Sequence, residues 1–116
     1  MIEPGIIEIR TTFASRAAAT DCAERLVRAG LAACVQVDGP ITSTYSWRGA
    51  VETAEEWRCS CKTTAEGRAA CLEAIRRLHD YDTPELIVSD LLASAPYAAW
   101  VRAAVGAGER PPRDDA

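Results

Sequence analysis

Hydrophobic and polar residues alternate along several stretches of the chain, and a period of two predicts β-strands. In the first stretch, Ile7, Ile9 and Thr11 share one face, while Glu8 and Arg10 share the other. Strands of this kind are half-buried, with the apolar face against a core. The predicted strands are Ile6–Thr12, Leu31–Val37 with a continuation from Ile41, Val51–Thr63 and Leu86–Leu92.

Three other stretches repeat apolar residues every three or four positions, which is the period of a helix with one buried face. Ser15 is the expected N-cap of the first helix, and Gly30 the expected residue beyond its end. Thr63 and Glu66 fit a capping box that opens the second helix. The expected apolar contacts are Ala19, Cys22, Ala23 and Leu26; Cys71, Leu72, Ile75 and Leu78; and Tyr97, Trp100 and Val101 in a last helix that starts at Ser94 or Ala95.

Two of the predicted strands form a long β-hairpin. Its turn is Arg48-Gly49, because glycine adopts the positive φ that tight hairpin turns need. Asp38-Gly39-Pro40 interrupts the first of these strands with a bend or bulge. The hairpin is longer than a compact domain of this size needs, and Tyr45 and Trp47 lie near its tip. We expect such a hairpin to rest on another subunit.

The order of elements is β-α-β-β-α-β with a terminal helix. Split βαβ units in this order predict an α+β fold, the ferredoxin-like βαββαβ sandwich, here with a long β-hairpin and a C-terminal helix. Residues 1–105 are expected to form a single domain. Residues 106–116 are rich in glycine, proline and charge, which predicts a disordered tail.

Composition narrows the possible partners. The formal net charge of −4 argues against a general nucleic-acid or anionic-membrane binder. No apolar run reaches membrane-spanning length and no export signal is visible, so we expect a cytoplasmic protein. The five cysteines are odd in number and include no CxxC motif. We therefore expect free thiols rather than a disulfide framework.

Candidate chemistry concentrates in the turn His79–Glu85, between the second helix and the last strand, which holds the only histidine of the chain. Imidazole and carboxylate together suit zinc, copper(II) or nickel. His79 and Glu85 would supply two ligands, with Asp80 or Asp82 as a third, so we expect weak metal binding. The alternative is a helix C-terminus followed by a solvated turn.

Lys62, Tyr81 and Glu85 flank the hairpin and this turn, so they are candidates for binding a small anion, with Glu85 positioning the lysine. The alternative is an ordinary salt bridge that ties the strand to the turn. Cys59 and Cys61 share a strand face and would suit a soft ion such as copper(I), although core packing explains them better.

Enzymatic readings have little support in the residues. Acylphosphatases share this fold class but need an asparagine and a glycine-rich loop, and the chain contains no asparagine. No Ser/His/Asp set is visible around His79. Recognition of RNA by the sheet would need exposed aromatic residues on the central strands and basic flanks, and the acidic net charge opposes it. We expect a binding or regulatory module rather than an enzyme.

Five segments in the same order give a more specific signal, because together they resemble the divalent-cation tolerance (CutA) family over nearly all of residues 6–104. The matching segments are Leu31-Ala32-Ala33-Cys34, Thr42-Ser43-Thr44-Tyr45-Ser46-Trp47-Arg48-Gly49, Lys62-Thr63-Thr64, His79-Asp80-Tyr81-Asp82-Thr83-Pro84-Glu85 and Tyr97-Ala98-Ala99-Trp100.

The resemblance implies a ferredoxin-like protomer, a tight homotrimer similar in architecture to the PII signalling proteins, and a link to tolerance of copper or other divalent metals without an established reaction. In a PII-like trimer, an intersubunit cleft would collect Lys62, Tyr81 and Glu85 with residues near Trp47. We therefore expect a trimeric metal-responsive protein. The alternative is a PII-like sensor of a small anionic ligand that has no metal role.

The chain also departs from its relatives. Thr11 stands where some members carry cysteine, Leu78 where some carry a second histidine, and Asp80 where the family turn usually has proline. Of the positions that the family associates with metal, His79 and Glu85 remain. No cofactor is certain from the sequence, and a divalent ion such as copper is the candidate.

Overall fold

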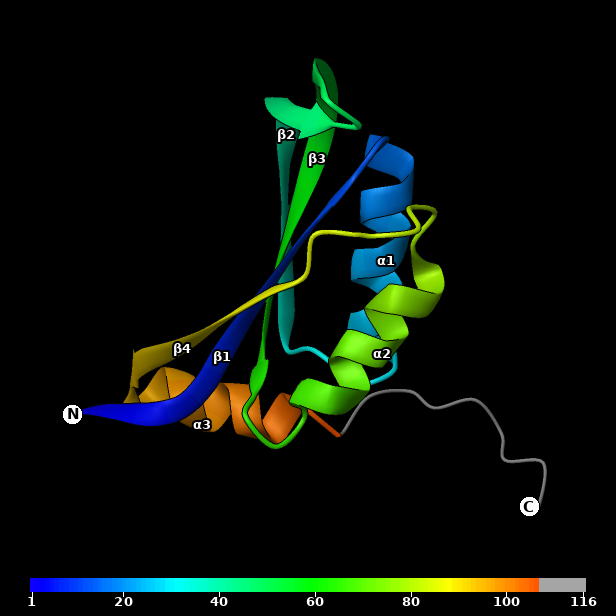
Figure 1. Cartoon of the computed structure of the whole chain (residues 1–116). Coiled ribbons are helices and arrows are strands. Elements are labelled where there is room, and N and C mark those ends of the chain that lie inside the picture. Colours follow the sequence, from blue (N-terminus) through cyan, green and yellow to red (C-terminus); the bar gives the residue numbers. More distant parts are fainter. Residues whose placement is uncertain (107–116) are drawn as a thin grey trace, which may run out of the picture.

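The computed structural model describes residues 1–106, which form an α+β fold with one four-stranded sheet and three helices (Figure 1). The strand order is β2-β3-β1-β4, and each neighbouring pair is antiparallel. This arrangement confirms the predicted split βαβ fold. The elements are β1 (Ile2–Phe13), α1 (Arg16–Arg28), β2 (Cys34–Trp47), β3 (Ala50–Thr64), α2 (Arg68–Leu78), β4 (Ile87–Ser94) and α3 (Ala95–Ala104).

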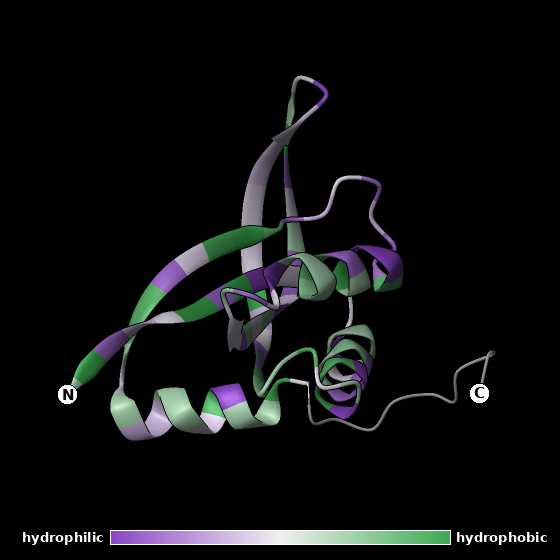
Figure 2. Cartoon of the chain, turned by 90° about the horizontal axis from the view of Figure 1, so that it is seen from below, coloured by the Kyte–Doolittle hydropathy of each residue, from purple (hydrophilic) through white to green (hydrophobic). Residues whose placement is uncertain are grey.

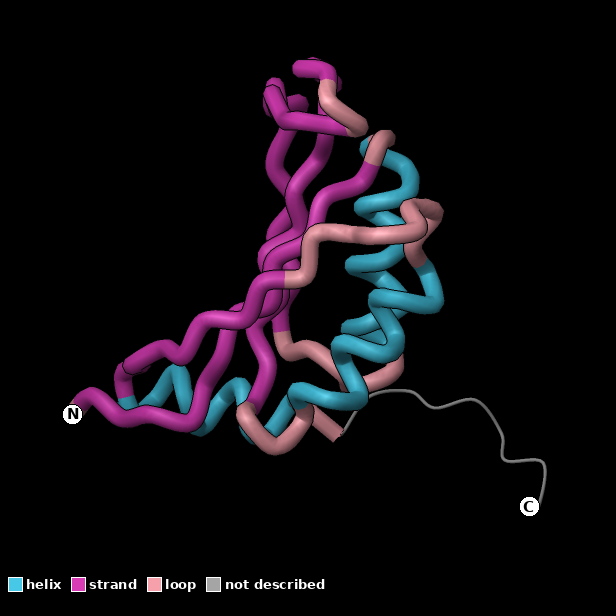
Figure 3. Tube along the Cα trace, viewed as in Figure 1, coloured by secondary structure: helices cyan, strands magenta, loops and turns pink. Residues whose placement is uncertain are grey.

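The main core lies between the sheet and the helices α1 and α2, which run beside the strands in Figure 3. Ile7 and Ile9 of β1 point into it, because side chains alternate along a strand and these two share a face. Register places Ile9 beside Cys61 of β3. The helices and β3 complete the cluster with Ala19, Cys22, Leu26, Cys59, Cys71 and Ile75.

Helix α3 forms a second, smaller cluster at one end of the sheet. Ile6, which points away from the main core, packs there with Ala98 and Val101. The Ser94 side chain accepts a hydrogen bond from the Tyr97 amide at 3.3 Å, as expected for an N-cap. Tyr97 and Trp100, which we expected to anchor this helix, are instead exposed. Helical periodicity gives the residues that share a face, but it does not show which face is covered.

Several element boundaries differ from the sequence predictions; β1, for example, begins at Ile2 rather than Ile6. Strand β2 begins at Cys34 rather than Leu31, and the predicted capping box does not open α2. The Thr63 hydroxyl donates to the Leu31 carbonyl at 2.8 Å instead, a contact between distant segments. The Thr64 hydroxyl accepts from the Gly67 amide at 3.0 Å, so a tight turn precedes the helix.

The hairpin of β2 and β3 has the predicted turn. Arg48 (φ 51°) and Gly49 (φ 81°) both have positive φ, as in two-residue turns that follow the twist of the strands. The predicted bulge is also present, because pairing shifts between Asp38 and Ile41. A Cβ at Gly39 would lie 2.5 Å from the ring of Trp57, so the bulge needs glycine where the strand crosses this side chain.

The sheet face opposite α1 and α2 carries a partly buried ion cluster. The Lys62 ammonium lies 3.1 Å from one Glu8 oxygen, and the Arg10 guanidinium lies 2.9 Å from the other. Burial alone would raise the pKa of Glu8, but the hydrogen bonds and charges of Lys62 and Arg10 outweigh it, so the pKa is lowered. Glu8 therefore stays ionised and ties β1 to β3.

Three further expectations concern the ends of the chain, the membrane and the cysteines. The Gly106 amide donates to the Gly30 carbonyl at 2.7 Å, so the described fold continues to this residue. The rest of the expected tail lies outside the described residues. Among residues 1–106, no helix has the length and hydropathy needed to span a bilayer. All five cysteines are free thiols, and all except the half-buried Cys34 are buried.

Candidate functional site

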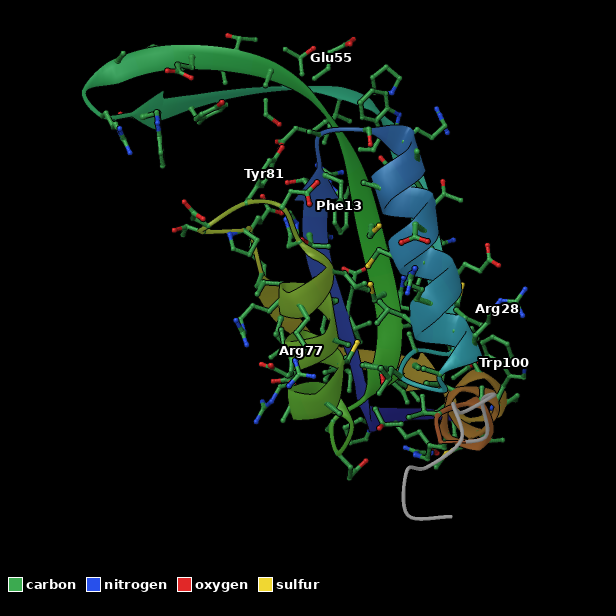
Figure 4. The ribbon with its side chains drawn as sticks, turned by 90° about the vertical axis from the view of Figure 1, so that its right-hand side faces the viewer. Phe13, Arg28, Glu55, Arg77, Tyr81 and Trp100 are labelled. Carbon is green, nitrogen blue, oxygen red and sulfur yellow. The ribbon has the colours of Figure 1, made fainter. Side chains whose placement is uncertain are left out.

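A cavity of about 820 Å³ lies where the hairpin overhangs the turn between α2 and β4. Figure 4 shows Tyr81 of this turn below the hairpin, with Glu55 on the opposite side of the hairpin ribbon. The cavity therefore has one wall from β2 and β3 and another from the turn. Its lining residues are Thr12, Ser43, Thr44, Tyr45, Trp47, Glu52, Glu56, Tyr81, Asp82, Thr83, Pro84 and Glu85.

His79 fixes the start of the turn through its ring. It caps the C-terminus of α2 in extended conformation, so the chain leaves the helix at this residue. Its imidazole stacks on Phe13, with centroids 4.2 Å apart and planes 12° from parallel. The Tyr81 ring also contacts the imidazole, with centroids 5.0 Å apart and planes 41° from parallel. The histidine is thus held between the end of β1 and the aromatic residue of the turn.

Both ring nitrogens of His79 have partners. The Tyr81 amide donates to Nδ1 at 3.4 Å, so the ring proton belongs on Nε2, which lies 3.0 Å from the Thr11 hydroxyl. Burial lowers the pKa of His79, and it outweighs the Thr12 backbone hydrogen bond and the charges of Asp80 and Glu56 that would raise it. The imidazole is therefore neutral at pH 7 and engaged on both sides.

Tyr81 connects the turn to the hairpin. Its hydroxyl donates to Glu56 Oε2 on β3 at 2.9 Å. Burial, the hydrogen bond to Glu56 and the charge of that carboxylate raise the pKa of Tyr81 to about 12. The phenol therefore stays protonated at neutral pH and remains a donor, which holds the Glu56 carboxylate at the cavity wall.

The charge of the cavity has one sign. Glu52 and Glu56 line the hairpin wall, and Asp82 and Glu85 line the turn wall. No lysine, arginine or histidine is among the lining residues, all of which belong to the described part of the chain. Such a surface attracts cations and repels anions.

The predicted ligand-binding residues are partly brought together. Trp47, Tyr81 and Glu85 all line the cavity. Lys62 does not line the cavity. The prediction that Glu85 positions this lysine is wrong, because the Lys62 ammonium pairs with Glu8 and donates to Gln36 at 3.3 Å. Lys62 therefore helps to hold the neighbouring strands of the sheet together.

The predicted metal-binding residues lie in different surroundings. Glu85 lines the cavity, whereas His79 does not line it and faces Phe13 and Thr11. Within residues 1–106, no group of three or more His, Cys, Asp or Glu side chains is arranged to hold a metal ion. Cys59 and Cys61 are fully buried in the main core, and burial raises the pKa of Cys61, which favours the packing interpretation.

Sequence reasoning missed the carboxylates and the tyrosine of the hairpin wall. Counting back from the Arg48-Gly49 turn pairs Tyr45 with Glu52 across the hairpin. This local register was the available signal, because it places an aromatic and an acidic side chain together on one face. The approach of Glu56 to Tyr81 joins segments that are 25 residues apart and has no such local signal.

Comparison with known proteins gives a consistent result. Residues 7–104 match the family model described as CutA1 divalent ion tolerance protein. The chain is similar to the divalent-cation tolerance protein CutA of Citrobacter koseri, with 32% identity over 88% of this chain and 90% of that protein. A homologue from Xenopus laevis is 36% identical over 72% of this chain, which spans 56% of that protein.

Solved structures agree with these sequence relatives. CutA from Synechococcus elongatus PCC7942 superimposes with a TM-score of 0.85 at 33% identity, covering 91% of this chain and 96% of that one. Another structure of that protein is described as complexed with a Bis-Tris molecule.

Proposed function

The chain belongs to the CutA1 divalent ion tolerance family, and on that premise we propose that it is a homotrimeric binding module that responds to divalent metal ions. The observation that carries the proposal is the sign of the cavity, with four carboxylates and no basic residue among its lining residues. The family is named for tolerance of ions and not for a reaction. We propose a binding or regulatory role without catalysis.

Metal binding at this site is expected to be weak. Carboxylates alone bind first-row transition metals less tightly than sites that include several nitrogen or sulfur ligands. Glu85 is available at the cavity wall, but His79 can join a metal through Nδ1 only after it loses the hydrogen bond from the Tyr81 amide. We therefore propose copper(II) as the test ion, with a dissociation constant no tighter than roughly micromolar.

Calorimetry with copper(II) on the wild-type protein and on Glu85→Gln tests this proposal. Glu85→Gln keeps the size of the side chain and removes its charge, so copper(II) binding should weaken. His79→Gln tests whether the imidazole is a ligand in addition to the carboxylates. A loss of copper(II) affinity as large as that of Glu85→Gln would show that the imidazole does bind the ion. Nanomolar binding that survives both substitutions would contradict the proposed site.

Two exposed apolar surfaces support assembly. The outer half of the hairpin exposes Tyr45, Trp47 and Val51, and β4 exposes Ile87 and Leu92. Figure 2 shows hydrophobic colour along much of β4, which is an edge strand of the sheet. Exposed apolar edges of this kind normally find a partner.

The two surfaces are different, so a contact between the hairpin of one copy and β4 of the next is heterologous. Such contacts close into a ring when the rotation between copies permits it. Three copies is the number that the family resemblance implies, and we propose a trimer on that basis. A cytoplasmic location also remains a proposal, with which the free thiols are compatible.

The alternative function, a sensor of a small anion, has less support. An anion in the cavity of one protomer would face the carboxylates of both walls. Lys62, the basic residue expected to bind it, is paired with Glu8 on the sheet. Calorimetry that shows succinate binding to the metal-free protein would favour this alternative.

A further inference from the structure

The cavity combines acidic with aromatic side chains, and this combination suits organic cations in addition to metal ions. We propose that it binds an aliphatic diammonium ion, a flexible hydrocarbon chain with a positive amino group at each end. This inference deepens the proposed cation-binding role by naming a second class of ligand for the same cavity.

The aromatic lining is the first argument. Tyr45, Trp47 and Tyr81 come from both walls of the cavity. A positive ammonium group is attracted to the face of an aromatic ring, and its hydrocarbon neighbours gain from burial against the same surface. The guanidinium of Arg48 already lies 5.3 Å from the centroid of Trp47, so a cation does occupy one face of this ring. A metal ion with its water shell would gain little from these rings.

The spacing of the carboxylates is the second argument. Glu52 and Glu56 lie on the same strand face four residues apart, which corresponds to about 13 Å along β3. Asp82 and Glu85 belong to the facing turn. One small ion is unable to contact carboxylates that are so far apart, and no cluster suited to a metal is present among residues 1–106. A chain with two separated charges can contact two of them at once.

The remaining lining residues fit the same ligand. The Glu56 carboxylate is held in place by the Tyr81 hydroxyl, so one end of the site is ordered before a ligand arrives. Thr12, Ser43 and Thr83 add hydroxyl groups that can accept hydrogen bonds from ammonium groups. The cavity volume of about 820 Å³ is within the usual range for small-molecule sites.

Calorimetry at low ionic strength with 1,5-diaminopentane tests the proposal on the full chain. n-Pentylamine, with one charge, should bind at least about fivefold more weakly, since it can pair with one carboxylate only. Glutarate, a chain of the same length with two negative charges, should show no binding. Added salt should weaken the diamine, because exposed charges are screened.

Three variants locate the site. The double substitution Glu52→Gln and Glu56→Gln should weaken diamine binding at least about tenfold. Trp47→Ala should weaken it severalfold, with light scattering to check that the variant still assembles, because Trp47 is also proposed to contact another copy. Glu55→Gln is the control for charge removal, because it neutralises one carboxylate of the same strand on the side away from Tyr81. It should change the affinity by less than about twofold.

The outcomes separate this inference from the proposed function. No diamine binding at millimolar concentration, equal binding of glutarate, or an equal loss in Glu55→Gln would overturn the diammonium site. None of these results would affect copper(II) binding by Glu85 or the trimer. Loss of copper(II) binding together with retained diamine binding would leave the cavity an organic-cation site and remove its metal role.

Discussion

The two halves of the β2–β3 hairpin use the same strands for different purposes. In the inner half, Cys59 and Cys61 are fully buried under α1 and α2. In the outer half, beyond the bulge at Gly39, Val51 is 79% exposed and Trp47 is 49% exposed. Both halves are paired β-structure, but only the inner half has a core of its own within the protomer.

This difference explains where the candidate site lies. The inner half, with β1 and the helices, gives a fixed frame at Phe13 and His79. The outer half extends past that frame and faces the turn, which leaves the cavity between them. Exposure of the apolar side chains of the outer half to water would be unfavourable in a lone protomer. Their exposure therefore indicates a surface that contacts another copy or a ligand.

The largest predicted effect is in the main core that packs against the inner half, where Ile9 of β1 lies beside Cys61 of β3. Ile9→Ala removes buried volume from the main core and should lower the free energy of unfolding by about 2–5 kcal/mol. Val51→Ala, in the exposed outer half, should change it by less than about 0.5 kcal/mol in dilute protein. Urea denaturation of both variants measures the difference. Equal losses at the two positions would show that the outer half of the hairpin is as tightly packed as the main core.

A smaller effect on stability is expected at the ion cluster on the open face of the sheet, the face opposite α1 and α2. Glu8 is largely buried between Lys62 and Arg10, so Glu8→Gln should lower the free energy of unfolding by about 1–3 kcal/mol. Asp21→Asn is the control, because its pair with Arg25 on α1 is exposed and should contribute only about 0.3–0.5 kcal/mol. Similar values in both variants would mean that burial of the Glu8 pair adds nothing.

How well each feature of the fold could be predicted depends on how far apart in sequence the interacting residues are. The order of the strands, the Ser15 cap, the hairpin turn and the bulge depend on residues close in sequence, and the structure confirms them, although some strand ends differ. The open-face cluster needs the pairing of Glu8 with Lys62 between distant strands. Thr63 failed as a cap for the same reason, since its hydroxyl bonds to the distant Leu31 carbonyl.

The candidate site was predictable in its turn and in Trp47, but not in its charge. The turn residues Tyr81 and Glu85 lie within six positions of the only histidine in the sequence, which directed attention to them. Of the predicted metal pair, Glu85 lines the cavity, whereas His79 does not line it and stacks on Phe13. No local pattern predicts that stacking, because β1 ends 66 residues before the turn begins.

The smallest effect concerns pH. Burial lowers the pKa of His79 in the folded protein, whereas in the unfolded chain it should be near its ordinary value of about 6.5. Between these two values the unfolded chain binds more protons, so stability rises with pH and is lost on acidification below about 6.5. Protonation would also place an N–H at Nδ1 against the Tyr81 amide.

Urea midpoints between about pH 8 and pH 5 measure this dependence. The wild-type midpoint should fall on acidification, and the fall should be shallower in His79→Gln, which has no titrating ring. An identical slope in the variant would assign the pH dependence to other groups, such as the carboxylates of the cavity. A midpoint that rises on acidification would contradict the sign of the His79 shift.

The central claim is that the outer half of the hairpin is an interface between copies of this chain, and light scattering at micromolar concentration tests it most directly. The wild type should have the mass of three chains. The double variant Trp47→Asp and Val51→Asp should have the mass of one chain with unchanged circular dichroism, because both residues are exposed in the protomer. A wild-type protein that stays monomeric at this concentration would contradict the account.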